Sequence, residues 1–229
     1  MNENKDRDKL RELEGVPSVE TNLAGRGRLT GVTGVIGGIG SGKSAVLEIL
    51  QEKYGCAVFR TDDIAKELMQ PGEPCFEALK AAFGTRILTS DGRLDKKQYG
   101  TLIYHDAGLL RLSDSIVHPA VWEAVERRVS DCRRRGTAAV IETALPGRQF
   151  YDICDRVWYV HTEKEVRIAR LMRSRGLSRA NCEEIIANQR NEDVYREKSD
   201  AVIENSGSIS ETEHRIAELA ALRCHTETT

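Results

Sequence analysis

One glycine-rich stretch near the start of the chain constrains its fold more than any other feature. Residues 37–44 match the pattern G-x-x-x-x-G-K-[ST]; an apolar, β-branched stretch precedes them, and a helical pattern with apolar Val46 and Leu47 follows. Glycines let successive backbone N–H groups curl around phosphate oxygens, and the start of the helix points its positive end at the same anion. Because both flanks fit, we prefer this interpretation to a plain glycine-rich turn. The sequence therefore predicts a nucleoside triphosphate site.

Residues within this stretch have distinct expected roles. We expect Lys43 to reach the β- and γ-phosphates of the nucleotide and the hydroxyl of Ser44 to ligate Mg²⁺. The expected nucleotide-binding residues of the stretch are Gly38, Ile39, Gly40, Ser41, Gly42, Lys43, Ser44 and Ala45.

Composition limits the partners that the chain is expected to have. Its 229 residues are enough for one sizeable α/β domain, and its formal net charge of −2 argues against a nucleic-acid partner. The six cysteines form no C-x-x-C pair and no apolar run reaches the length of a membrane span, so we expect a cytoplasmic protein without a membrane partner. Residues 1–28 are expected to be a poorly ordered extension, and residues 29–229 a single domain.

Five short apolar runs are predicted to be strands. They are almost continuously apolar, which is typical of a parallel sheet that is buried on both faces. Helical patterns separate them, as in βαβ units. The predicted fold is therefore an α/β three-layer sandwich around a five-stranded parallel sheet. The expected strands span residues 29–36, 56–60, 138–142, 156–160 and 201–204.

Two longer helical segments interrupt this alternation. Residues 62–135, after the second strand, are expected to form a helical insert that binds the substrate. Residues 163–190, after the fourth strand, are expected to form a helical lid with a break at 176–178. The helices expected within the insert span residues 62–70, 73–83, 94–104, 107–117 and 119–135.

Two aspartates, Asp62 and Asp63, follow the end of the second predicted strand. An aspartate at such a place most often caps the next helix. However, catalytic groups of open α/β sheets lie at the carboxyl ends of strands, and a phosphotransferase needs a group that handles the proton of the acceptor hydroxyl. The nearby triphosphate site therefore favours Asp62 as a catalytic and substrate-binding residue, with Asp63 as a cap or surface residue.

The third predicted strand ends in a carboxylate, Glu142. An apolar strand that ends in an acid resembles the Walker-B pattern, in which the acid holds Mg²⁺. A solvated strand end explains the same residues equally well. Glu142 is therefore a candidate metal-site residue together with Ser44.

Four arginines lie at residues 167–175, in the expected lid. An exposed basic helix face is the usual explanation for such a run. In a triphosphate enzyme, however, a lid that follows the fourth strand lays arginines over the phosphoryl group in transfer. We favour this interpretation, with Arg170 and Arg175 as the candidate contacts. The lone His118 in the insert reads, by itself, as a packing or capping residue.

The order of these motifs resembles the dephospho-CoA kinase family over about residues 29–222. The glycine-rich stretch alone would indicate only a nucleotide-binding protein, and the remaining elements in register make the resemblance specific. These elements are residues 61–68 with Pro71-Gly72, Phe83-Gly84 with residues 87–88 and 91–95, residues 117–119, residues 170–172, Asn188-Gln189 and residues 199–207.

The resemblance implies a P-loop kinase, related to nucleoside monophosphate kinases, that uses ATP and Mg²⁺. It implies addition of the 3′-phosphate to dephospho-CoA, the last step of coenzyme A synthesis. It also implies that Asp62 deprotonates the ribose 3′-hydroxyl and that His118 with the insert binds dephospho-CoA. The turn with Asn205 and Gly207 is implied to receive the adenine of ATP.

The chain departs from the family pattern at four places, one of which is Ser174, where the family often has an arginine four residues after Arg170. Arg60 stands where the family often has the first acid of an Asp-x-Asp pair, and Ala45 stands where a threonine is frequent. Residues 143–148 replace a stretch that carries a glutamate in the family, so we assign no role there. The phosphate-binding lysine and the expected base are retained, which indicates an active enzyme. The alternatives are a kinase for another small metabolite, a nucleotide-binding switch without a small-molecule acceptor, and an inactive relative.

Overall fold

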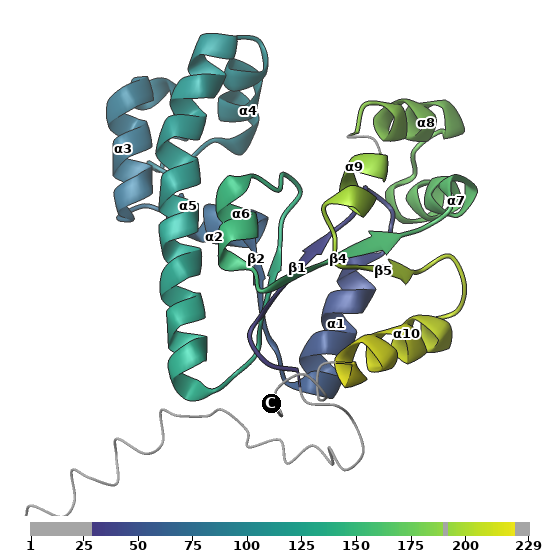
Figure 1. The fold of residues 1–229 in the computed structure, drawn as a ribbon. Coiled ribbons are helices and arrows are strands. Elements are labelled where there is room, and N and C mark those ends of the chain that lie inside the picture. Colours follow the sequence, from purple (N-terminus) through teal and green to yellow (C-terminus); the bar gives the residue numbers. More distant parts are fainter. Residues whose placement is uncertain (1–28, 190–191, 223–229) are drawn as a thin grey trace, which may run out of the picture.

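The computed structural model describes residues 29–189 and 192–222, and it shows a parallel sheet between two layers of helices (Figure 1). The strands pair in the order β2-β3-β1-β4-β5, and every pair is parallel. They are β1 (Val32–Ile36), β2 (Ala57–Arg60), β3 (Ala139–Glu142), β4 (Arg156–His161) and β5 (Ala201–Glu204). The predicted sheet is confirmed, with small shifts at the strand ends. The expected extension at 1–28 lies outside the described residues.

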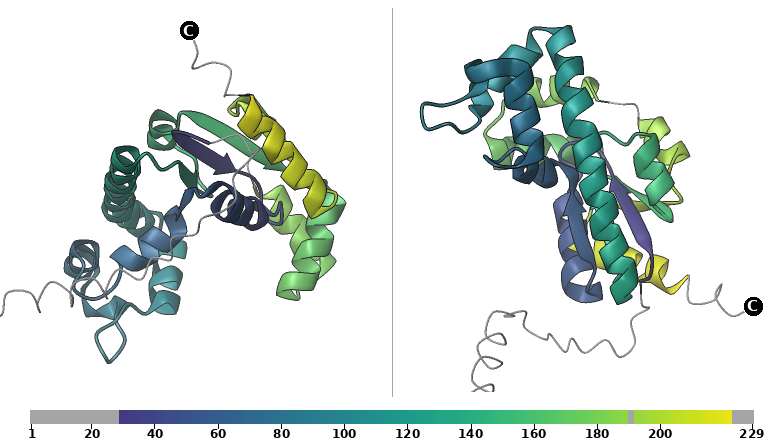
Figure 2. Two further views of the ribbon diagram at one scale, coloured as in Figure 1. Left: turned by 90° about the horizontal axis from the view of Figure 1, so that it is seen from below. Right: turned by 90° about the vertical axis from the view of Figure 1, so that its left-hand side faces the viewer.

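Helices cover both faces of the sheet, as the apolar strands require. On one face, α1 (Lys43–Tyr54) and α10 (Ile209–Ala221) pack against the strands (Figure 2). The other face is covered by α2 (Thr61–Leu68), α6 (Arg148–Ile153), α9 (Glu192–Glu197) and the C-terminal half of α5 (Ala107–Arg135). Each interface has its own buried core, so the predicted three-layer sandwich is confirmed.

The segment between β2 and β3 builds a helical lobe with a separate core. Here α3 (Pro74–Phe83), the short 3₁₀ helix η1 (Gly84–Ile87) and α4 (Lys96–Tyr104) pack against the N-terminal half of α5. The ring of Phe83 meets that of Tyr99 edge-on, with 5.6 Å between the ring centroids. Through α2 and α5 this lobe is joined to the sheet, and it stands beside the carboxyl-terminal edge of the strands (Figure 1).

The longest helix corrects one expectation. The prediction of two helices, at 107–117 and 119–135, was wrong, because α5 runs unbroken through Pro119. A proline inside a helix lacks an N–H donor and crowds the preceding turn, at a cost of about 3 kcal/mol. The helix continues because Ile116 packs in the core of the lobe while Val121 packs against the sheet, so both halves are held. Neither α5 nor another helix of the described ranges is long and apolar enough to cross a membrane.

After β4 the chain forms a hairpin of two helices, α7 (Lys164–Arg175) and α8 (Arg179–Ala187). The predicted break is confirmed: Gly176 ends α7, and the Ser178 hydroxyl caps the start of α8. Ile39 of the glycine-rich loop packs against the buried core of the hairpin. The α7–α8 hairpin and the helical lobe therefore stand on opposite sides of that loop (Figure 1).

The short helices α6 and α9 were not expected from the sequence. Each has six residues, too few to show a helical period. They are held by long-range packing instead. Phe150 of α6 is fully buried against Gly34 of β1, and the ring of Tyr195 in α9 stacks on Tyr159 of β4 with 5.5 Å between centroids.

Candidate active site

The glycine-rich stretch forms the loop between β1 and α1, at the carboxyl-terminal edge of the sheet. Gly42 caps the N-terminus of α1 at a φ of 81°, a left-handed conformation that glycine adopts without strain. A Cβ on Gly38 would collide with the guanidinium of Arg167, so this position also needs glycine. The N-terminus of α1 therefore faces the space over the loop, which is an arrangement that binds phosphate.

A cavity of about 560 Å³ opens over this loop, and we call it the loop cavity. Its charged lining residues come from α1, β2, α2, β3 and α7, which are far apart in the sequence. They are Lys43, Arg60, Asp62, Glu142, Arg170 and Arg175. The uncharged part of the lining includes most of the expected nucleotide-binding residues, namely Gly38, Ile39, Gly40, Gly42 and Ser44. Ser41 is a buried residue of the loop itself, and Ala45 lies in the first turn of α1.

Lys43 lies folded against the loop. Its ammonium donates a hydrogen bond to the carbonyl oxygen of Gly37 at 2.8 Å and lies 3.7 Å from a carboxylate oxygen of Glu142. Burial lowers the pKa of this ammonium below its ordinary value, and the charge of Glu142 opposes that shift. A partly desolvated ammonium at this place is suited to bind phosphate oxygens.

Glu142 lies at the end of β3 with its side chain 14% exposed. Burial raises the pKa of its carboxyl group above the ordinary value, and the charge of Lys43 opposes that shift. Ser44 and Asp62 line the same cavity, so hydroxyl and carboxylate oxygens, which Mg²⁺ prefers as ligands, surround one space. In the described part of the chain no three His, Cys, Asp or Glu residues form a self-contained metal site. The donor set therefore fits an ion that also takes phosphate and water oxygens.

The two aspartates after β2 differ in their surroundings. Both are exposed, but the carboxylate of Asp63 accepts a hydrogen bond from the ammonium of Lys66 at 2.7 Å, which lowers its pKa. Asp62 lines the loop cavity and also a second cavity of about 430 Å³. Asp62 therefore lies where the two cavities meet, whereas Asp63 lines neither cavity. This placement supports the different roles assigned to them.

The second cavity is lined mainly by apolar side chains of α2 and α5 and by the loop after β3; we call it the acceptor cavity because His118, expected from the sequence to bind the substrate, is part of its lining. The lining residues include Ala65, Val117, His118, Val121, Trp122, Leu145 and Pro146. His118 is the basic side chain of this lining. Its ring lies 3.6 Å from the carboxylate of Asp114, one turn earlier in α5, and 56% of the side chain is exposed.

Asn205, which follows β5, supports the loop from below. Its side-chain amide donates to the carbonyl oxygen of Ser41 at 2.7 Å, and its amide oxygen accepts from the hydroxyl of Thr212 at 2.7 Å. Arg170 donates to the backbone carbonyl of Asn205 at 2.8 Å. Gly207 lies in the next turn, beside the side chain of Glu211. The buried amide of Asn205 thus holds the phosphate loop, and the adenine contact expected of Asn205 and Gly207 stays a prediction.

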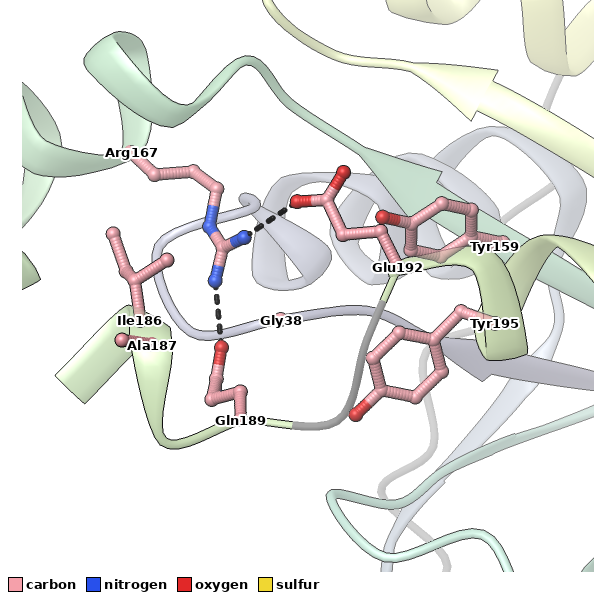
Figure 3. A pocket seen from close by; sticks show the side chains of 8 residues that line it. All are labelled: Gly38, Tyr159, Arg167, Ile186, Ala187, Gln189, Glu192 and Tyr195. Carbon is pink, nitrogen blue, oxygen red and sulfur yellow. Dashed lines mark hydrogen bonds and ion pairs between the residues drawn. The ribbon is translucent and has the colours of Figure 1, made fainter. Parts of the chain in front are cut away.

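Arg167 is the residue that the sequence analysis did not select. Its buried guanidinium donates to the carbonyl oxygen of Ile39 at 2.9 Å. It also donates to Gln189 at 2.6 Å and to Glu192 at 2.9 Å (Figure 3). The side chain of Gln189 also accepts a hydrogen bond from the N–H of Ile39 at 3.0 Å. Arg167 therefore ties the glycine-rich loop to α7 and to α9. The sequence offered one sign that Arg167 is buried: it stands four residues before Leu171 and therefore shares the packed face of α7.

The family model and the relatives that match this sequence are described as dephospho-CoA kinases. A family model described as dephospho-CoA kinase matches residues 31–211. A dephospho-CoA kinase from Geobacter sulfurreducens is 36% identical over 194 residues, which cover 84% of this chain and 98% of that protein. A dephospho-CoA kinase from Symbiobacterium thermophilum is 36% identical over 187 residues, which cover 81% of this chain and 78% of that protein.

Solved structures show the same architecture. A crystal structure from Thermus thermophilus matches with a TM-score of 0.71 and 26% identity, over 86% of this chain and 99% of that chain. A dephospho-CoA kinase from Campylobacter jejuni matches with a TM-score of 0.63 and 20% identity, over 83% of this chain and 97% of that chain. At 20% identity, the second match shows only that the two proteins share a fold.

Proposed function

Because the chain belongs to the dephospho-CoA kinase family, we propose that it transfers the terminal phosphoryl group of ATP to the ribose 3′-hydroxyl of dephospho-CoA. The product is coenzyme A, and the reaction is the last step of its synthesis. One observation supports the proposal most directly: Asp62 lies where the loop cavity meets the acceptor cavity. A carboxylate at this place reaches a phosphoryl group on one side and an acceptor hydroxyl on the other.

The loop and its neighbours bind the nucleotide in this proposal. Backbone N–H groups of residues 38–44 hold the phosphates, and Lys43 exchanges the carbonyl of Gly37 for β- and γ-phosphate oxygens. Ser44 and Glu142 would hold Mg²⁺, which supplies neutralising charge at the phosphates when it is bound. Asn205 and Arg167 keep the loop in the shape that makes these contacts.

The proposed chemical step uses Asp62 as the base. The acceptor oxygen forms a bond to phosphorus while the bond from phosphorus to the bridging oxygen of the β-phosphate breaks, and Asp62 takes the proton of the hydroxyl. The transition state of phosphoryl transfer is loose, so positioning and electrostatic stabilisation supply most of the rate. The cations that line the loop cavity would stabilise that charge.

We further propose that the α7–α8 hairpin, within residues 163–190, is the lid and that the helical insert at residues 62–135 binds the body of dephospho-CoA through the side chains that line the acceptor cavity. Arg170 and Arg175 would bring positive charge to the phosphoryl group, and closure would exclude the water that hydrolyses ATP. His118 and the apolar lining of the acceptor cavity would bind the acceptor. The cytoplasmic location stays a prediction from the composition.

The experiment that tests this function measures ADP release from ATP and Mg²⁺ by the purified chain. Dephospho-CoA, several nucleoside monophosphates and gluconate are compared as acceptors, and the product is identified by mass. Of these acceptors, we expect only dephospho-CoA to stimulate ADP release, with coenzyme A as the product. Stimulation by another acceptor would indicate a different small-molecule kinase, and tight ATP binding without stimulation by any acceptor would indicate a nucleotide-binding switch or an inactive relative.

A further inference from the structure

Arg60 is the last residue of β2, and it lines the loop cavity. In the sheet it pairs with Glu142 at the end of β3. Residues paired in this way on neighbouring parallel strands point to the same face, so the guanidinium stands on the side of the Glu142 carboxylate. Asp62, the proposed base, follows two residues later. A strand end, which is a rigid part of the fold, therefore holds Arg60 among the groups assigned to the reaction.

The cations around the loop cavity differ in what they already bind. Lys43 is paired with Glu142, and Arg170 donates to the backbone of Asn205. Within residues 29–189 and 192–222, by contrast, the side chains of Arg60 and Arg175 make neither a hydrogen bond nor an ion pair. A guanidinium with unused donors matches phosphate oxygens in geometry and charge. These two arginines are thus the ones available to a phosphate ligand without loss of a protein contact.

The position of Arg60 indicates which phosphate it meets. The lining of the acceptor cavity includes Thr61 and Asp62, whereas Arg60 belongs to the wall of the loop cavity. β2 lies at one edge of the sheet, and Arg175 belongs to the helix that follows β4, on the other side of β1 (Figure 1). The two arginines therefore approach the loop from opposite sides. Because both line the cavity over the loop, the terminal phosphate of a nucleotide held by the loop would lie between them.

On the basis of the proposed function, we infer that Arg60 is a further catalytic residue that binds the terminal phosphoryl group of ATP during transfer. As phosphorus leaves the bridging oxygen of the β-phosphate, ADP keeps that electron pair, the acceptor oxygen takes its place, and Asp62 receives the hydroxyl proton. Arg60 exchanges no proton. Its guanidinium donates hydrogen bonds to the non-bridging oxygens and stabilises their charge.

A purely structural role for Arg60 would be that of a counter-ion to Glu142. Burial raises the pKa of Glu142, and the charge of Arg60 is among those that oppose this shift. A lysine at this position could act as the counter-ion of Glu142, but it could not replace the arginine in binding phosphate oxygens. Arg60→Lys keeps the positive charge that a counter-ion needs, but it loses the planar fork that holds two phosphate oxygens.

The test compares wild-type protein with Arg60→Ala, Arg60→Lys and a control, Arg134→Ala, whose side chain is exposed in a surface pair with Asp131. Calorimetry with Mg²⁺ and no acceptor measures the Kd for ADP and for β,γ-imido-ATP. We expect Arg60→Ala to leave the ADP affinity within about twofold but to weaken β,γ-imido-ATP binding about tenfold, since only the latter carries the terminal group. With dephospho-CoA, kcat should fall about 10²- to 10³-fold, and Arg60→Lys should recover only part of it.

Three results would overturn the inference. They are an equal loss of affinity for both nucleotides, full recovery of kcat by Arg60→Lys, and a rise in the KM for dephospho-CoA without a change in nucleotide binding or kcat. The last result would assign Arg60 to a phosphate of the acceptor. ADP binding reports that the site is folded, and the calorimetric comparison needs no acceptor. Absence of turnover with dephospho-CoA in the wild-type protein would therefore refute the proposed function. The role of Arg60 would still be judged by nucleotide binding.

Discussion

The ammonium of Lys43 and the carboxylate of Glu142 lie 3.7 Å apart, and each opposes the effect of burial on the other. Lys43 begins α1, directly after the loop, and Glu142 ends β3, which pairs with β1 in parallel. The fold therefore brings both groups to one edge of the sheet. Each has a different proposed partner in the reaction, phosphate for the ammonium and Mg²⁺ for the carboxylate, so substrate binding would separate a pair that the free protein holds together.

The lowered pKa of Lys43 predicts an alkaline limit to nucleotide binding. Phosphate binds the ammonium and not the amine, and this group loses its proton at a lower pH than the ordinary value of 10.5. We expect the Kd for ADP to rise with pH through a midpoint below 10.5 in the wild-type protein. Lys43→Arg should show a flat profile, because guanidinium stays protonated. Calorimetry at a series of pH values up to 10.5 measures the Kd for ADP. If the Kd rises with pH in the same way in both proteins, Lys43 is not the titrating group.

The place of Glu142 predicts a change in metal dependence. Glu142→Gln removes a carboxylate from the proposed Mg²⁺ site, so the Mg²⁺ concentration for half-maximal activity should rise about tenfold or more. Glu123→Gln is the matched control, because Glu123 is exposed in a surface pair with Arg127. Titration of activity with Mg²⁺ checks the prediction. An unchanged Mg²⁺ dependence with a lower kcat would mean that Glu142 acts on Lys43 alone.

The different surroundings of Asp62 and Asp63 predict different effects of the same substitution. Asp62→Asn removes the proposed base and should lower kcat by about 10²- to 10⁴-fold while the Kd for ADP stays unchanged. Asp63→Asn should leave kcat close to that of the wild-type protein, since its carboxylate faces Lys66 at the surface. Steady-state kinetics and a melting curve of each variant decide the matter. Asp62 lies in the first turn of α2, whose N-cap is Arg60, so a large drop in Tm with little loss of kcat would show that Asp62 mainly stabilises this helix.

The central part of the fold could be predicted because its signals are local. Strands such as residues 138–142 and 156–160 are continuously apolar, and the glycine-rich stretch carries its own loop geometry in eight consecutive residues, 37–44. The rule that strand ends meet at one edge of a parallel sheet then placed Lys43, Asp62 and Glu142 near one another. The structure brings these three side chains to one cavity.

The remainder depended on contacts between distant residues. Arg167 donates to Ile39 across 128 positions, and Asn205 donates to Ser41 across 164, so no local pattern shows either contact. The unbroken α5 is a similar case. Pro119 is a local signal for a helix end, but packing of the same helix against two separate cores outweighs it.

The acceptor cavity predicts a role for His118 in substrate affinity. His118→Ala should raise the KM for dephospho-CoA about fivefold, the loss expected for one hydrogen bond, while the KM for ATP stays unchanged. His105→Ala is the control, because His105 is an exposed residue at the end of α4. Kinetics with each substrate varied in turn separate the two constants. Equal KM values for dephospho-CoA in the two variants would remove His118 from the acceptor site.

The contacts of Arg167 predict that this residue supports both stability and nucleotide binding. Arg167→Ala leaves Gln189 and the carbonyl of Ile39 without their charged donor, so the free energy of unfolding should fall by about 2–3 kcal/mol. Arg173→Ala, on the exposed face of the same helix, should change it by less than about 0.5 kcal/mol.

Urea unfolding with and without ADP distinguishes the two contributions of Arg167. If Arg167 holds the loop in its binding shape, Arg167→Ala should also gain less stability from ADP than the wild-type protein gains, because a weaker Kd reduces the stabilisation at a fixed ligand concentration. An equal gain from ADP in both proteins would limit Arg167 to packing α7 against the rest of the domain. A reduced gain in Arg167→Ala, together with a normal gain in Arg173→Ala, would show that the loop depends on this guanidinium to bind phosphate.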